Sequence, residues 1–287
     1  MMKDYLRSLG IATAFLSSLS WADDPIILIP PLSQAPQLDG QVDAFWQAAP
    51  VQRVTLRPNS EFEAPDPVTE VLLRAGHFQG RVYFLLEWAD AAEGRQHKPF
   101  VWDKARNKYV RGAQREDRLA LQFRIAGDYQ ADWLASTGFT ADIWHWKASR
   151  SDPLGLADDK WTKVSRDRLI RSSKVSQGQT HIYVLRQWDE GEPLYTTRRY
   201  RKYAGDIKPK YILNPELESG STTDVKAASH WAQGRWVLEL SRKLDTGHSD
   251  DARFELGQVV LGGLSVFNQS ESEQHFISST QRFHFLP

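Results

Sequence analysis

The residues whose types and spacing most suggest chemistry are His145 and Lys147, two positions apart in the stretch ADIWHWKASRSDPLGLADD. If residues 143–147 form a strand, both side chains point to one face, while Trp144 and Trp146 point to the other. A strand anchored by two indoles could then present nitrogen ligands to a metal in an apolar pocket. A lysine amine binds a metal only after losing its proton, which burial or the metal itself can bring about. The alternative is an edge strand with an exposed lysine and an internally hydrogen-bonded histidine.

Composition and missing motifs exclude much other chemistry. The chain has no cysteine, so disulfides, thiolate metal sites, iron–sulfur clusters, thiol catalysis and covalent c-type haem attachment are excluded. Methionine occurs only at Met1 and Met2. The sequence has no G-x-S-x-G, H-E-x-x-H, P-loop or G-x-G-x-x-G motif, and no two of its eight histidines are spaced i, i+2 or i, i+4. We therefore expect a protein that is not itself an enzyme.

The N-terminus and the charge balance bear on location and partners. Residues 1–22 combine a short basic start, an apolar stretch from Leu9 to Leu19 and a small-residue exit, which predict a cleaved secretory signal peptide. The apolar stretch is about half of the roughly twenty residues that a spanning helix needs, which disfavours a membrane anchor. The 36 basic and 36 acidic side chains balance, which argues against nucleic acid or anionic lipid as the main partner. We expect a periplasmic product with no membrane span.

The remaining chain, residues 23–287, predicts a single all-β domain. Short aromatic and β-branched runs between polar turns favour an antiparallel β-sandwich of immunoglobulin or jelly-roll type, with long loops and few short helices. One short amphipathic turn carries Trp46. Residues 150–167 and 198–223 lack clear periodicity and are expected to form long surface loops. The main predicted strands are 71–75, 82–88, 119–125, 143–147, 181–188, 235–240, 254–261, 264–267 and 281–286.

Several stretches resemble the haem-binding domain of the ethylbenzene dehydrogenase gamma subunit and of its dimethyl sulfide dehydrogenase and cytochrome c-552 relatives. The D-x-W-x-W-K-A segment with G-x-A-D-D downstream is fairly specific. The D-G-x-x-x-x-x-W opening is shared with carbohydrate-binding relatives of this sandwich, which is related to DOMON domains and family 9 carbohydrate-binding modules. The matching pieces, in the family's order, are LDGQVDAFWQAAPVQRVTL (38–56), VYFLLEWAD (82–90), REDRLALQF (115–123), ADIWHWKASRSDPLGLADD (141–159), GRWVLELSRKLDTG (234–247) and GGLSVFNQSESEQHFIS (262–278).

The resemblance implies a sandwich that holds one non-covalent b-type haem. Such a domain would pass electrons to or from a periplasmic redox partner, either a cytochrome or a molybdenum-containing oxidoreductase subunit. Some members carry a CxxCH attachment motif before the D-x-W-x-W-K segment, but the corresponding residues 128–140 contain no cysteine. The haem expected here is therefore held only by non-covalent contacts and axial ligands.

The iron ligands carry over from the family only in part. In the gamma subunits a lysine and a methionine hold the iron. The lysine falls on Lys147, whereas the methionine position falls near Leu121, and residues 23–287 contain no methionine. Three interpretations remain: a histidine replaces the methionine, the haem is five-coordinate, or the haem has been lost. The candidate histidines are His145, His77 and His275.

The composition also fits the walls of a haem site. A porphyrin needs flat apolar walls, with basic groups at the rim for its two propionates. Arg150 could reach a propionate. The basic run RRYRK (198–202) fits an acidic partner, a propionate or a solvated loop. The tryptophans that could form the walls, or alternatively pack the sandwich core, are Trp144, Trp146, Trp133 and Trp161.

Two other functions fit the same sequence. A carbohydrate- or small-molecule-binding module on the same sandwich would stack sugar rings on some of the eleven tryptophans and would leave Lys147 without a role. A haem-less relative would stabilise a partner through its surface. Both alternatives predict a colourless protein.

Overall fold

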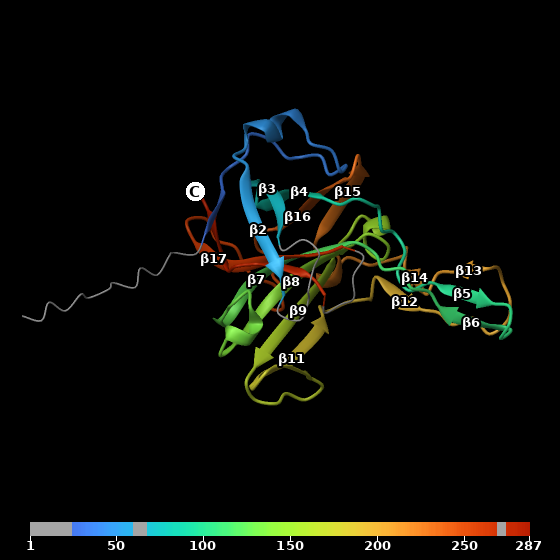
Figure 1. The fold of residues 1–287 in the computed structure, drawn as a ribbon. Helices are drawn as coiled ribbons and strands as arrows, with labels where there is room; N and C mark the ends of the chain where they lie inside the picture. The colour runs from blue at the N-terminus through green and yellow to red at the C-terminus, as the bar shows by residue number, and fades with distance from the viewer. Residues whose placement is uncertain (1–24, 60–67, 269–273) are drawn as a thin grey trace, which may run out of the picture.

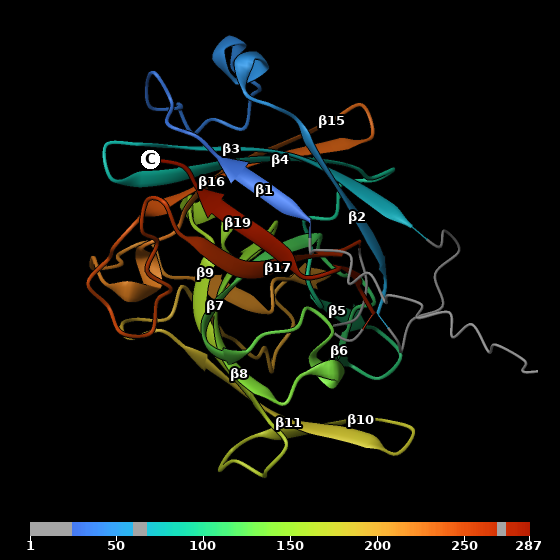
Figure 2. The ribbon, with the colours of Figure 1, turned by 90° about the vertical axis from the view of Figure 1, so that its left-hand side faces the viewer.

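The fold consists of β-strands with a few short 3-10 helices. The computed structural model describes residues 25–59, 68–268 and 274–287, so the predicted signal peptide, residues 1–22, lies outside the described residues. Most strands belong to one 14-stranded sheet that folds back on itself into two layers (Figures 1 and 2). The prediction of an all-β antiparallel sandwich is confirmed. None of the helices in the described ranges has the length and apolarity to span a membrane.

The first layer contains the strands of the candidate site, and its pairings are antiparallel. In order of hydrogen bonding these strands are β10 (Ser173–Gln177), β11 (Thr180–Trp188), β9 (Asp158–Ser165), β8 (Gly138–Lys147), β7 (Arg118–Asp128) and β17 (Val259–Phe267). A short strand, β18 (Phe276–Ser278), joins β17 to the second layer.

The second layer is also antiparallel. Its strands are β2 (Gln52–Pro58), β3 (Thr69–Phe78), β4 (Arg81–Ala89), β16 (Arg235–Lys243) and β15 (Lys226–Ala232). The two ends of the described chain meet at one edge, where β1 (Ile26–Ile29) runs parallel to β19 (Gln281–Phe285) and β19 pairs with β17.

Two smaller sheets lie outside the sandwich. One joins β12 (Tyr195–Thr197) to β14 (Tyr211–Leu213), and the other joins β5 (Phe100–Asp103), β6 (Lys108–Arg111) and β13 (Ile207–Lys208). The second of these forms an arm that projects from the sandwich (Figure 1). The 3-10 helices are η1 (Ala44–Ala48), η2 (Trp133–Ala135), η3 (Asp152–Leu154) and η4 (Ser221–Thr223).

Aromatic side chains from the two layers meet in the core. Trp144 of β8 contacts Phe84 of β4 with their ring centroids 5.8 Å apart, and Trp146 lies 5.0 Å from Trp236 of β16. The indole of Trp46 on η1 is fully buried and donates to Glu239. Because alternate residues of each strand face this core, strand register decides which side chains remain for the opposite face.

The structure corrects two expectations from the sequence. Residues 158–165, expected to lie in a loop, form β9 in the middle of the first layer. The strand carries charged side chains on both faces, among them Asp158, Asp159 and Lys160, which hides the usual apolar alternation. The strand expected over 254–261 begins at Val259, because residues 255–258 form a turn with Gly257 at a φ of 81°.

Candidate functional site

A cavity of about 680 Å³ lies on the face of the first layer that points away from the core. This volume is within the range of small-molecule and cofactor sites. The cavity walls come from β7, β8, β9, β11 and β17 together with η2 and the start of β12. The polar side chains of the lining include Arg118, Gln122, His145, Lys147, Arg150, Lys160, Thr162, Arg186, Tyr195 and His275, and the apolar ones include Trp133, Ile143, Trp188 and Phe267.

Strand alternation decides which residues of β8 reach the cavity. His145 and Lys147 line it, as the alternation predicts. Trp144 and Trp146 point the other way and are fully buried in the core, so the expectation that they wall a cofactor site is wrong. Their role is to fix β8 against the second layer, which holds the cavity-facing pair in place.

Leu121, the position expected to match the family's methionine, also lies in the core and not in the cavity. On β7 the core face carries Leu121 and Phe123, whereas Ala120 and Gln122 line the cavity. The assignment of Leu121 to the cofactor site is therefore wrong. A change of one residue in register moves a side chain to the opposite face of a sheet.

Lys147 lies at the back of the cavity with only 3% of its surface exposed. Its amine donates to the carboxylate of Asp158 and, at 2.9 Å, to the hydroxyl of Tyr195. Burial, followed by the charges of Lys160 and Arg150, lowers the pKa of Lys147 well below its usual value. The amine can therefore become neutral, which is the form that binds a metal.

A second lysine shares the same carboxylate. Lys160 of β9 lies 2.7 Å from Asp158 and 3.8 Å above the ring of Trp188. Burial is the main cause that lowers its pKa to about 7. Two lysines therefore share one carboxylate in the wall of the cavity.

His145 presents a nitrogen without a hydrogen-bond partner. Its Nε2 is buried and has no partner among the described residues. Burial, followed by the charge of Lys147, lowers the pKa of His145 well below 6.5, so the imidazole is neutral at pH 7 and keeps a lone pair. The ring of His145 stacks on Phe267 at 5.5 Å, and that of His275 stacks on Phe267 at 4.5 Å.

Arg150 lines the cavity beside Lys147 but is held by other groups. Its Nε donates to Glu116 at 2.5 Å, and its guanidinium lies 4.8 Å above the ring of Tyr211. Arg118 lies 4.1 Å above the ring of Phe267, and Arg186 lies 5.3 Å above Trp133. The cavity wall is therefore basic and aromatic together.

Sequence comparison gives the family of the chain. The family model described as ethylbenzene dehydrogenase matches residues 43–279, more than four fifths of the chain. The chain belongs to the ethylbenzene dehydrogenase family. Every residue that lines the cavity, from Pro58 to Ile277, falls within the matched region. The family is that of a subunit of an oxidoreductase complex.

Comparison with other proteins adds two similar solved structures. No curated protein matches the chain. A family 9 carbohydrate-binding module from Caldicellulosiruptor kristjanssonii in complex with glucose is 11% identical, with a TM-score of 0.38, over 88% of this chain and 85% of that one. A putative carbohydrate-binding protein from Bacteroides uniformis ATCC 8492 is 9% identical, with a TM-score of 0.38, over 91% of this chain and all of that one.

In this member of the ethylbenzene dehydrogenase family the predicted ligands do not all converge. Lys147, His145 and His275 line one cavity. His77 lies outside it, where its Nε2 is 2.8 Å from the carbonyl oxygen of Leu286, so the structure removes it from the candidates. Of the predicted wall residues, Trp133 lines the cavity.

Several residues of the cavity were not predicted, and Trp161 is a further predicted wall residue that lies outside it. Trp161 lies between two cavity-facing residues of β9 and is not part of the lining, because its side chain points to the other face. Lys160, Tyr195 and Trp188 were not predicted. The alternation of Asp158 with Lys160 in an extended segment was an available signal for Lys160. Tyr195 follows no local pattern and reaches the site only through the fold.

Proposed function

We propose that this member of the ethylbenzene dehydrogenase family is an exported b-type haem protein that transfers electrons within an oxidoreductase system. The observation that carries the proposal is the pairing of His145 and Lys147 on one buried strand face of a basic cavity. Both side chains offer nitrogen donors that burial favours in the neutral form. When bound, a haem supplies one-electron redox chemistry at its iron.

The residues of the cavity fit the chemistry of such a group. Axial ligation needs a neutral amine or imidazole, and the two donors on β8 meet this requirement. Because Lys147 now donates to Asp158 and Tyr195, binding a metal would require it to leave these acceptors. Lys160 stays on Asp158, so the carboxylate keeps a cationic partner. The guanidinium groups of Arg118 and Arg186 supply positive charge for propionates.

The second axial ligand follows from the direction of the strands. His145 and Lys147 leave the same face of one strand, two residues apart. A haem held by Lys147 would take any second ligand from a segment other than β8, so a donor that enters the cavity from elsewhere is favoured. His275 enters the cavity from the segment before β18 and is that candidate. His145 remains the alternative, together with a five-coordinate iron.

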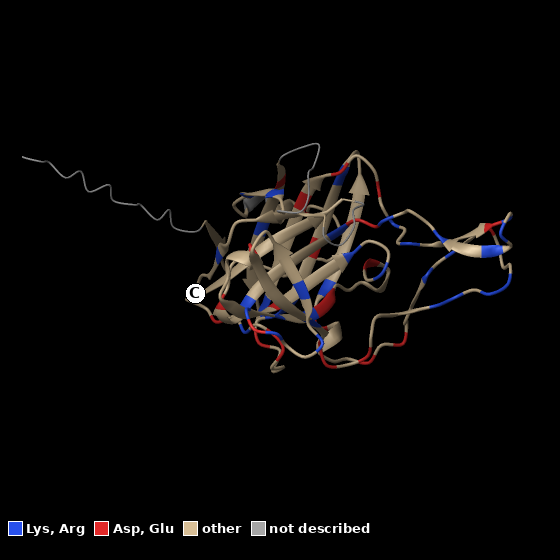
Figure 3. Ribbon diagram, turned by 60° about the horizontal axis from the view of Figure 1, so that its bottom comes forward, with Lys and Arg blue, Asp and Glu red and all other residues tan. Residues whose placement is uncertain are grey.

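The redox partner is proposed from the charge of the arm formed by β5, β6 and β13. This arm and the run that leads to it carry many exposed basic side chains and few acidic ones (Figure 3). An acidic surface on a periplasmic cytochrome or a molybdenum-containing subunit would complement it. The exposed basic residues are Lys104, Arg106, Lys108, Arg111, Arg198, Arg199, Arg201 and Lys202. Export to the periplasm rests on residues 1–22.

Neutral sugar is a weaker candidate ligand for this cavity. Sugar-binding modules stack their ligands on free indole faces. Here Lys160 lies over Trp188 and Arg186 lies over Trp133, so both cavity indoles have a cation on one face. The guanidinium groups of Arg118 and Arg186 in the lining favour an anionic ligand.

The test is an absorption spectrum of the protein exported to the periplasm with haem available, recorded oxidised and then reduced with dithionite. We expect a Soret band and α and β bands that sharpen on reduction. Lys147→Leu should shift these bands. Lys163→Leu is the matched control, because it removes an exposed lysine of the same strand as Lys160 that does not line the cavity, and it should leave the band positions unchanged. His145→Ala and His275→Ala identify the second ligand.

Two results would overturn the proposal. A colourless protein that takes up no added haemin would rule out haem binding and favour the sugar-binding alternative. Identical spectra for wild type and Lys147→Leu would show that Lys147 does not bind the iron. Far-ultraviolet circular dichroism of each variant establishes that it is folded before its spectrum is compared.

A further inference from the structure

A cluster of four buried carboxylates lies behind the cavity, on the core side of the first layer. Asp142 of β8 and Asp159 of β9 face this side, opposite to Lys147 and Asp158. Asp189 directly follows β11, and Asp251 lies in the loop after β16. The four carboxylates therefore come from three neighbouring strands of one layer, or the residue directly after one of them, and from a loop of the other layer.

The four carboxylates are close to one another. Oxygen atoms of Asp142, Asp159 and Asp251 all lie within 4.8 Å of one another, and the Asp189 carboxyl contacts that of Asp159. Arg242 is the guanidinium paired with the cluster: its Nη1 donates to Asp142 at 2.5 Å and to Asp251 at 2.8 Å, while His248 Nδ1 lies 3.7 Å from Asp251. If all four carboxyls are ionised, three negative charges remain without compensation.

Several oxygens of the cluster have no hydrogen-bond partner. Asp159 is 0% exposed, and neither of its carboxylate oxygens receives a hydrogen bond from any described residue. With the carboxyls ionised, the same holds for both oxygens of Asp189 and for Oδ1 of Asp142, and a proton kept on Asp189 would be shared with Asp159. Burying a carboxylate without a partner is costly, so native proteins pair such groups or use them to coordinate a metal.

We infer that Asp142, Asp159 and Asp189 bind a divalent cation of the calcium type between β8, β9 and the end of β11. Their unpartnered oxygens are the hard ligands that Ca²⁺ prefers, and Ca²⁺ takes six to eight of them in flexible geometry. Two positive charges would offset most of the excess negative charge. Thiolate and imidazole ligands, which softer metals prefer, do not contribute to the cluster.

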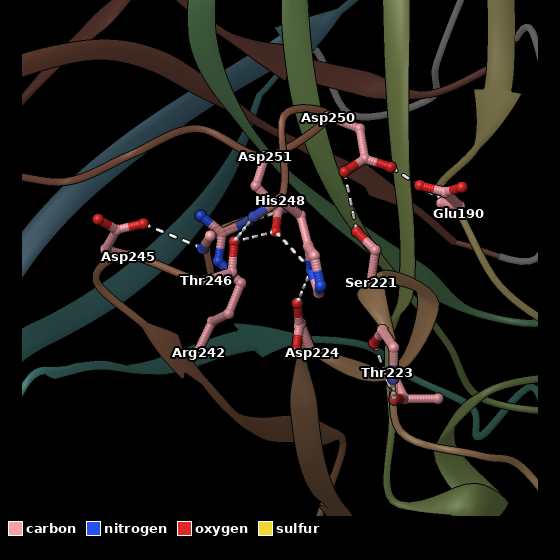
Figure 4. A network of polar contacts seen from close by, with 12 residues as sticks. Glu190, Ser221, Thr223, Asp224, Arg242, Asp245, Thr246, His248, Asp250 and Asp251 are labelled. Carbon is pink, nitrogen blue, oxygen red and sulfur yellow. Dashed lines mark hydrogen bonds and ion pairs between the residues drawn. The ribbon is translucent and has the colours of Figure 1, made fainter.

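In the neighbouring surface cluster of Asp224, His248 and Asp251, the polar groups have hydrogen-bond partners (Figure 4). His248 Nδ1 lies 2.8 Å from Asp224, and Asp251 receives hydrogen bonds from Thr246 and Arg242. These groups satisfy one another, so they have no need of an ion. Asp224 therefore offers a matched control for the buried carboxylates.

An ion at this position would stabilise the cavity wall from behind. β8 and β9 carry His145, Lys147 and Lys160 on one face and the proposed ligands Asp142 and Asp159 on the other. The ion would fix the spacing of these two strands and their contact with the loop after β16. This inference is independent of whether the cavity binds haem.

The test uses Tb³⁺ as a luminescent substitute for Ca²⁺ on the full-length exported chain after chelator treatment. Trp144 Nε1 donates to Asp142 at 3.3 Å, so an indole lies close enough to sensitise Tb³⁺ emission. We expect saturable emission on tryptophan excitation, displacement by excess Ca²⁺, and lifetimes in H₂O and D₂O that report few bound waters. Asp159→Asn and Asp189→Asn should weaken binding at least tenfold, whereas Asp224→Asn should not.

The outcomes separate the inference from its alternatives. Ca²⁺ should also raise the melting temperature of wild type and of Asp224→Asn, because a ligand that binds only the folded state stabilises it. Absence of both saturable emission and a Ca²⁺-dependent melting shift in wild type overturns the inference. A site lost only in Asp224→Asn, or one with many bound waters, places the ion at the surface cluster and overturns it as well. The lifetime measurement uses wild type alone and remains decisive if the asparagine variants do not fold.

Discussion

The buried carboxylates should make the metal-free protein less stable as the pH rises. Asp189→Asn is the most direct perturbation, because the amide has nearly the same shape but cannot ionise. Burial, followed by the charge of Asp142, raises the pKa of Asp189 to about 9 from 3.8. The folded protein therefore holds a proton that the unfolded chain releases near pH 4.

The magnitude follows from this difference in pKa. A raised carboxyl pKa contributes stability that is complete below the unfolded value and is lost as the pH rises through the folded one. At 1.36 kcal/mol per pKa unit, ionisation of the unfolded chain costs the fold about 2 kcal/mol at pH 5 and at most about 6 kcal/mol at pH 8. The variant avoids this cost. The difference in free energy of unfolding between the variant and wild type should therefore be about 4 kcal/mol larger at pH 8 than at pH 5. This corresponds to about 8–16 °C in melting temperature.

Urea unfolding of both proteins in chelator at pH 5 and pH 8 measures this change. Asp224→Asn serves as the control. Its difference from wild type in free energy of unfolding should be about the same at both pH values, since Asp224 is paired with His248 near the surface. In saturating Ca²⁺ the order should reverse, because Asp189→Asn then lacks a ligand. A difference between wild type and Asp189→Asn that is the same at both pH values would refute the reasoning.

Four further substitutions test the packing around the site, each by urea unfolding. Lys147→Leu should cost about 1–3 kcal/mol, because Asp158 keeps Lys160 at 2.7 Å and Tyr195 at 3.0 Å; a loss above about 5 kcal/mol would mean that Asp158 is left unpaired. Trp146→Ala should lower the free energy of unfolding by about 3–5 kcal/mol, because its indole is buried in the core. Trp133→Ala should lower it by less than about 1 kcal/mol, because this side chain is half-buried. Equal losses would contradict the division between core and cavity. Gly262→Ala should cost about 1–3 kcal/mol, since its Cβ would lie 2.3 Å from the Gln122 carbonyl oxygen; an unchanged stability would show that β17 can shift.

The sequence predicted the orientation of β8 correctly because strand alternation is a local property. Two indoles at alternate positions imply a core face, and the residues between them must then face the other side. The same logic applied to RLALQF would have placed Leu121 in the core, since Leu119, Leu121 and Phe123 alternate there. The position that the resemblance implies for the family's methionine therefore falls on the core face of β7.

The strand β9 was not predicted because its charged side chains are buried by tertiary contacts that the sequence does not show. Asp158 pairs with Lys147 and Lys160 on the cavity face, while Asp159 joins the buried carboxylates on the other. A segment with adjacent aspartates and two lysines has the composition of a solvated loop when its neighbours are unknown. Its central position in the sheet depends on pairing with β8 and β11.

The sequence by itself determined the chemistry that is possible. Without cysteine, and with methionine only at Met1 and Met2, it excludes covalent haem attachment and leaves nitrogen donors such as Lys147 and His145 as candidate ligands. Strand alternation determined that these two share a face. Both properties are local, because composition and a period of two residues require no knowledge of the fold.

Only the tertiary structure decided which distant residues meet. It brought His275 into the cavity and left His77 outside, and it placed Asp189 against Asp159 on the opposite face. These contacts depend on strand order and register across the whole sheet. Side chains far apart in the sequence meet there because burying the aromatic core fixes one arrangement of the layers, and local periodicity does not encode that arrangement.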